Sequence, residues 1–191
     1  MNTTTTTYEY TERDRADLAM TVVLVSFTML FASLFLMYMV YRVTNSVWPP
    51  MGYDKIPLTI PTISTILLLL SSFTLREAHR KYLARKNFAP MFFTTLLLGI
   101  VFLVSQAFLW RYLDATGVYV ESGIFASILH AFTCIHAGHV VIAFLALLFC
   151  LPALRSKNEK RDYSIRFSNT SKFWHFLGIV WILMFLGLFI F

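Results

Sequence analysis

The sequence predicts an all-α, polytopic membrane protein built as one bundle of five transmembrane helices. Apolar residues make up 58% of the chain and charged residues only 14%, a balance far from that of soluble domains. Five apolar runs are each about 20 residues or longer, the length that a helix needs to cross the ~30 Å hydrocarbon core. Spans of a β-barrel would be about ten residues long with alternating polarity, and the runs show neither property.

The five helices are expected at residues 18–41, 56–75, 91–110, 123–151 and 173–191. The first follows a polar segment, residues 1–17, which we expect to be an amino-terminal tail. Its apolar run is too long for the core of a signal peptide, so we expect it to stay in the protein as a helix. The polar segments between the helices are short, which favours antiparallel neighbours in a single membrane domain, residues 18–191.

The lysine and arginine residues lie mainly on one side of the predicted bundle. The tail holds two of them, the segment after the second helix five and the segment before the fifth helix six, against three on the other side. Basic segments are retained in the cytoplasm, so we expect a cytoplasmic amino terminus and a carboxyl terminus outside. The net charge of +6 follows from this asymmetry and requires no nucleic-acid partner.

Three histidines, His130, His136 and His139, lie in an otherwise apolar stretch of the fourth predicted helix, HAFTCIHAGHVV. No Asp, Glu, Lys or Arg lies inside any predicted span, which argues against a transporter of protons or ions. His136 and His139 share one helix face, whereas His130 lies about 180° around the helix from His139. We interpret His136 and His139 as hydrogen-bonding groups between helices, packed where Ala137 and Gly138 let a neighbour approach.

Metal and haem ligation are the alternatives for these histidines. The pattern H-x-x-H lacks the glutamate and the spacing of the zinc motif H-E-x-x-H, and no other cluster completes a tetrahedral site. A haem between helices needs two histidines at equal depth. His79 and His175 lie at the cytoplasmic ends of their helices, whereas His139 lies about 18 Å from that end. A five-helix haem b subunit that oxidises quinol stays open as the second hypothesis.

Five short motifs are the most specific features of the sequence. They are WPPMG (48–52), IPLTIPTISTILLLLSSFTLREAH (56–79), LLLGIVFLVSQAFLW (96–110), IHAGHVVIA (135–143) and FWHFLGIVW (173–181). In this order they resemble subunit III of the haem-copper terminal oxidases, the cytochrome c and quinol oxidases. The resemblance covers about residue 24 to the carboxyl terminus. The common family form has seven helices, and this chain resembles the last five, as in the shorter bacterial versions.

The resemblance implies a non-catalytic accessory subunit of a respiratory oxidase that reduces oxygen to water. Such a chain stabilises the catalytic subunit, holds phospholipid, carries no redox centre and catalyses nothing in isolation. The haems and copper are then expected in its partners, catalytic subunit I and the electron-entry subunit II, in a bacterial cytoplasmic membrane. The sequence leaves open whether cytochrome c or quinol donates the electrons, and whether the complex joins a larger respiratory supercomplex.

Three membrane carboxylates of the family are missing from this chain. Leu34 stands at the glutamate of F-x-S-E, Leu109 at the glutamate of Q-x-x-E, and Gly178 at the aspartate of W-H-F-x-D. Leucine and glycine do not titrate, so proton transfer by acids of this subunit does not carry over to these positions. The sequence therefore favours a scaffold over a proton-delivering subunit.

The remaining candidate site residues lie at helix ends. Arg76, His79 and Arg155 are expected at cytoplasmic ends, where guanidinium groups bind lipid phosphates, so we expect them to hold a lipid headgroup. Each is also explained as an ordinary positive-inside residue. Trp174 and His175 open the fifth predicted helix and are expected to anchor it at the membrane interface.

Overall fold

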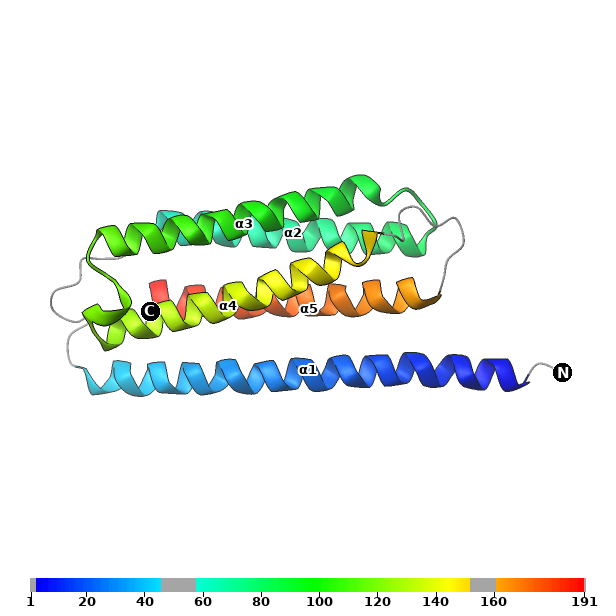
Figure 1. The fold of residues 1–191 in the computed structure, drawn as a ribbon, viewed down its shortest axis with the longest axis horizontal. Helices are drawn as coiled ribbons and strands as arrows, with labels where there is room; N and C mark the ends of the chain where they lie inside the picture. The colour runs from blue at the N-terminus through cyan, green and yellow to red at the C-terminus, as the bar shows by residue number, and fades with distance from the viewer. Residues whose placement is uncertain (1–2, 46–57, 152–160, 191) are drawn as a thin grey trace.

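The computed structural model describes residues 3–45, 58–151 and 161–190, and the long elements in these ranges are all helices (Figure 1). They are α1 (Thr3–Thr44), α2 (Thr59–Leu83), α3 (Ala89–Ala115), α4 (Ile124–Leu148) and α5 (Arg161–Phe185), with a 3-10 turn η1 (Val120–Ser122) before α4 and a π-helical turn η3 (Leu186–Ile190) after α5. In the described ranges, five helices are long and apolar enough to cross a membrane. The predicted all-α class with five spans is confirmed.

The five helices lie side by side along the longest dimension of the molecule (Figure 1). α2 and α3 form the most extensive pair, and α5 packs against α2, α4 and α1. The amino terminus, the α2–α3 turn and the start of α5 lie at one end of the bundle, and the α3–α4 turn and the carboxyl terminus lie at the other. Each helix therefore runs antiparallel to the next, as the short connections predict.

The helix boundaries differ most from the prediction at two polar segments, and α2 and α3 also continue to Leu83 and Ala115, beyond the predicted ends at 75 and 110. α1 begins at Thr3, so most of the tail predicted over residues 1–17 is a helical extension of the first span. α5 begins at Arg161, well before the predicted start at residue 173. Hydropathy locates only the part of a helix that needs lipid around it, whereas contacts between neighbours stabilise helical turns beyond that part.

Polar contacts join these two extensions and fix α1 against α5. Lys172 Nζ lies 2.8 Å from Asp17 Oδ1, and Asn169 Nδ2 donates to a backbone carbonyl of α1 at 3.2 Å. Near the other end of the helices, the Tyr38 hydroxyl donates to the carbonyl of Gly187. α1 is thus bonded to α5 at Ala16 and Asp17 and to η3 at Tyr38, although most of its apolar side chains are exposed.

Large aromatic side chains fill the centre of the bundle. Those less than 2% exposed include Trp174, Trp181, Tyr38, Phe92, Phe102, Phe132 and Phe167. The indole nitrogens of Trp174 and Trp181 donate to Ser71 Oγ at 3.1 Å and to Thr65 Oγ1 at 3.0 Å. Because both acceptors belong to α2, the two indoles tie α5 to α2 and set the depth of one helix against the other.

Candidate functional site

A basic pocket lies between α2 and α5 at the end of the bundle that holds the amino terminus. Its volume is about 420 Å³, and it is lined by Arg76, His79, Ser168, Ser171, Lys172 and His175. Arg76 and His79 are two of the residues predicted to hold a lipid headgroup, and His175 is one predicted to lie at the interface. The structure brings these three together with Lys172, which the sequence reasoning did not select.

Helical spacing explains why these side chains meet. Arg76 and His79 are three residues apart on α2, and each pocket residue of α5 lies three or four residues from another of them, so each set shares one helix face. Among the residues that the structure describes, no carboxylate lines the pocket. Glu77 pairs instead with Arg80 at 2.9 Å, and no carboxylate in the described part of the chain forms an ion pair with Arg76.

The chemistry of the pocket suits an anion with several oxygen acceptors. Arg76 and Lys172 supply permanent positive charge, and the serine hydroxyls and imidazoles supply further donors. The ring of His79 packs edge-on against Phe167, with 5.2 Å between centroids, which fixes one wall. A phosphate group fits this donor set. Arg155, the third predicted headgroup residue, lies outside the described residues.

His136 lies at the centre of the bundle and is fully buried. Its ring is surrounded by Phe31 of α1, Phe102 of α3 and Trp181 of α5, with centroid distances of 6.2, 6.1 and 5.3 Å. Neither ring nitrogen has a hydrogen-bond partner among the described residues. The prediction that His136 hydrogen-bonds directly to neighbouring helices is therefore wrong within the described part of the chain. Aromatic rings occupy the positions around the imidazole.

His139 also differs from its prediction. Its Nδ1–H donates to the carbonyl of Ile135 at 2.7 Å, within α4, because the carbonyl one turn back lies in reach of the imidazole. The ring packs on Phe27 and Phe31 of α1, at 4.3 and 5.7 Å between centroids. A Cβ at Gly138 would meet no described atom within 4 Å, so the interpretation that Gly138 admits a neighbouring helix is wrong here.

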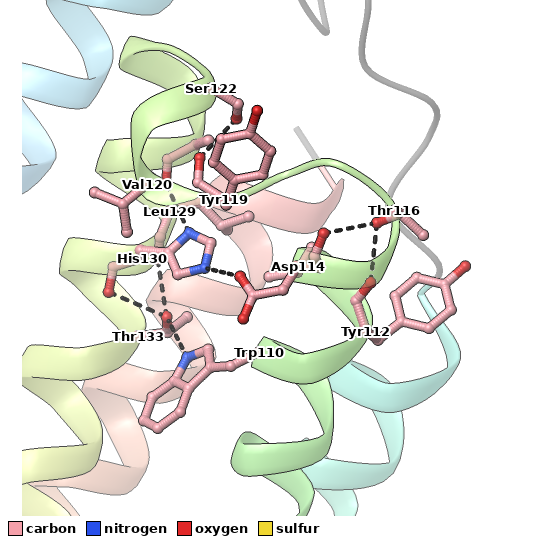
Figure 2. A network of polar contacts seen from close by, with 12 residues as sticks. Trp110, Tyr112, Asp114, Thr116, Tyr119, Val120, Ser122, Leu129, His130 and Thr133 are labelled. Atoms are coloured by element: carbon pink, nitrogen blue, oxygen red, sulfur yellow. Dashed lines mark hydrogen bonds and ion pairs between the residues drawn. The ribbon is translucent and has the colours of Figure 1, made fainter.

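His130 belongs to a polar group at the far end of the α3–α4 contact (Figure 2). Its Nδ1–H donates to a carbonyl of α4 at 3.0 Å, and its Nε2 lies 3.8 Å from Oδ1 of Asp114 on α3. One turn further in, the Trp110 indole donates to Thr133 Oγ1 at 3.0 Å. The contact between α3 and α4 is therefore polar from this end inward.

Trp174 and His175 have separate surroundings although they are adjacent in sequence. Trp174 is 1% exposed and lies in the core of the bundle, so its side chain is not on the outer surface. His175 lines the basic pocket. Adjacent residues of a helix point about 100° apart, so one faces the core while the other faces the pocket.

Of the three positions that lack the family's carboxylates, Leu109 and Gly178 are buried inside the bundle and Leu34 is partly buried. Leu34 borders an apolar pocket of about 300 Å³ between α1 and α4, and Leu109 is completely buried. A Cβ at Gly178 would lie 3.2 Å from Ser72 Oγ, so α2 and α5 approach closely there. A carboxylate at Leu109 would have to be buried, and one at Gly178 would require the helices to separate.

These features define a polytopic helical membrane protein with an aromatic core and a basic pocket between α2 and α5. The family model described as Cytochrome c oxidase subunit III matches residues 3–191. The chain belongs to the cytochrome c oxidase subunit III family, which confirms the resemblance seen in the five motifs.

Curated relatives support the same family. The chain is 32% identical to cytochrome c oxidase subunit 3 of Paracentrotus lividus over 141 residues, which cover 72% of this chain and 53% of that protein. It is 31% identical to the protein of the same name from Loxodonta africana, with 76% and 56% covered. For the Synechocystis sp. protein the identity is 28%, with 85% and 70% covered. The chain spans about half the length of the first two relatives.

Proposed function

We propose that this chain is a non-catalytic accessory subunit of a respiratory haem-copper oxidase, stabilising the catalytic subunit and holding phospholipid. The family match over residues 3–191 is the observation that carries this proposal. Catalytic subunit I and the electron-entry subunit II would then bind the haems and copper. The leucines at 34 and 109 and the glycine at 178 support a scaffold role, because none of them exchanges protons. The match favours this function over the haem b alternative.

We infer that the amino terminus faces the cytoplasm of a bacterium and the carboxyl terminus faces outside. The described lysines and arginines at the amino-terminal end of the bundle are Arg13, Arg15, Arg76, Arg80, Lys81, Arg85, Lys86, Arg161, Arg166 and Lys172. Those at the opposite end are Arg42 and Arg111. The positive-inside rule assigns the first end to the cytoplasmic side.

Purification from the native membrane in a mild detergent tests the accessory role. We expect a tagged chain to co-purify with larger subunits that carry the haem spectrum and the oxygen consumption. After separation from them, the chain is expected to be colourless and inactive, because the imidazole of His136 is packed against aromatic rings and that of His139 is bonded to its own helix. A Soret band that stays with the isolated chain and disappears in a His136→Ala or His139→Ala variant would favour the haem b alternative.

We propose further that the phosphate of an anionic phospholipid occupies the basic pocket. The support is the convergence of Arg76, His79, Lys172 and His175 around hydroxyl donors, without a lining carboxylate. The pocket also lies at helix ends on the basic side of the bundle, where lipid headgroups are found. Arg76 is the central group, because Lys172 shares its charge with Asp17.

Charge reversal at Arg76 tests the pocket. In the purified complex, Arg76→Glu is expected to lower the amount of bound anionic phospholipid at least about tenfold, because a basic residue near the surface contributes about 1 kcal/mol and the new carboxylate repels the phosphate. Lipid extraction with mass spectrometry measures the effect. Arg80→Glu is the matched control, since Arg80 lies one turn away and outside the pocket. Equal lipid loss in the two variants would show a general charge effect and contradict the site.

A further inference from the structure

Two fully buried polar side chains near the middle of the bundle lack hydrogen-bond partners in the described ranges. Gln106 of α3 is 1% exposed, and its amide nitrogen and oxygen are both unpartnered. His136 of α4 is 0% exposed, and both of its ring nitrogens are unpartnered. Buried polar groups in native proteins are hydrogen-bonded to protein or to ordered water, so four such atoms require an explanation.

The helix geometry places Gln106 and His136 at nearly the same depth. Phe102 of α3 lies against His136, with 6.1 Å between ring centroids, and Trp110 of α3 donates to Thr133 of α4. Gln106 is one turn from each of these α3 residues on the same face, so it lies opposite the turn of α4 between Thr133 and His136. The Gln106 amide and the His136 imidazole are not hydrogen-bonded to each other.

The donors that border the pair are already used. The indole of Trp181, which lies beside His136, donates to Thr65 of α2 at 3.0 Å. The hydroxyl of Thr133 donates to the carbonyl of Leu129 at 2.9 Å. These groups would have to break existing bonds to supply a proton to His136 or Gln106.

We propose that an internal water molecule is bound between Gln106 and His136 and bridges α3 to α4. Water is both donor and acceptor, as the amide and a neutral imidazole require. One bridging water spans about 5–6 Å between two heavy atoms, which suits groups at one depth that do not bond directly. The surrounding aromatic rings leave no charged partner for a larger ion. Asp114, His130 and Thr133 make the same helix contact polar from its exposed end (Figure 2).

A structure of the assembled complex at a resolution that shows ordered water tests the site directly. The expected result is a density peak about 2.6–3.2 Å from both the Gln106 amide and one nitrogen of His136. A direct bond between the amide and the imidazole, or an empty space between them, would overturn the proposal.

A double-mutant cycle on the thermal midpoint of the complex gives a second, independent test. In Gln106→Leu alone or His136→Phe alone, the bridging water loses one partner and stays beside the remaining polar side chain. The double variant removes both polar side chains. We therefore expect the thermal midpoint of the double variant to lie about 2–4 °C or more above the midpoint obtained by adding the shifts of the two single variants. The control cycle pairs Gln106→Leu with His139→Phe, where we expect additivity, because His139 is bonded to Ile135. Additivity in both cycles would count against the bridge.

Discussion

The Gly99→Leu variant is expected to accumulate poorly and to fail to assemble with its partners. A Cβ at Gly99 would lie 2.9 Å from Cη2 of Trp174 and 3.3 Å from Phe144. Trp174 has no room to move, because it is buried and its indole is bonded to Ser71. Even Gly99→Ala is expected to lower the free energy of unfolding by about 1–3 kcal/mol, and leucine by more. The yield of purified complex and its thermal midpoint measure both effects.

Gly138→Ala is the matched control, because Gly138 is also a helical glycine but a Cβ there meets no described atom within 4 Å. Replacing glycine by alanine inside a helix stabilises it by about 0.5–1 kcal/mol at either position. The difference between the two alanine variants therefore isolates the contact with Trp174. Equal thermal midpoints for the two would mean that α3 and α5 are not packed as closely as the structure has them.

The same pair of glycines shows what the sequence predicts and what it leaves open. The five spans follow from length and hydropathy, because a bilayer imposes both on every crossing helix. The sequence does not predict the rotation of each helix about its axis. Nearly every helix face is apolar, and an apolar face packs equally well against lipid or against protein. Gly138 was therefore chosen as a close contact from its motif, whereas Gly99, in a run of leucines, carries the closer approach.

The basic pocket was predicted in part for a similar reason. Arg76 and His79 were selected from their place at the end of the second span. The sequence pattern places Lys172 in a loop, because the predicted fifth helix begins one residue later. With α5 extended back to Arg161, Ser168, Ser171, Lys172 and His175 follow the spacing of one helix face. The spacing of these four residues predicts the shared face only if the polar segment 161–172 is included in the fifth helix.

A large loss of stability is expected from Trp181→Ala. Trp181 is completely buried, its ring lies 5.2 Å from that of Phe102 and 5.3 Å from that of His136, and its indole donates to Thr65. Removing a buried tryptophan side chain costs about 3–5 kcal/mol in the free energy of unfolding. For a chain of this size, the thermal midpoint of the complex is expected to fall by roughly 10 °C. Phe108→Ala is the control, because Phe108 is 64% exposed on the outside of α3.

Trp181→Phe separates the packing of the indole from its hydrogen bond. A phenyl ring keeps most contacts with Phe102 and His136, and Thr65 keeps its own bond to the carbonyl of Pro61 at 2.8 Å. No buried group is left unpartnered, so the expected cost is about 1 kcal/mol, far below that of alanine. Helices in lipid are held together mainly by packing and not by exclusion of water, which makes the alanine cavity the decisive term. If the phenylalanine variant were as unstable as the alanine variant, the bond to Thr65 and not the aromatic core would hold α5 against α2.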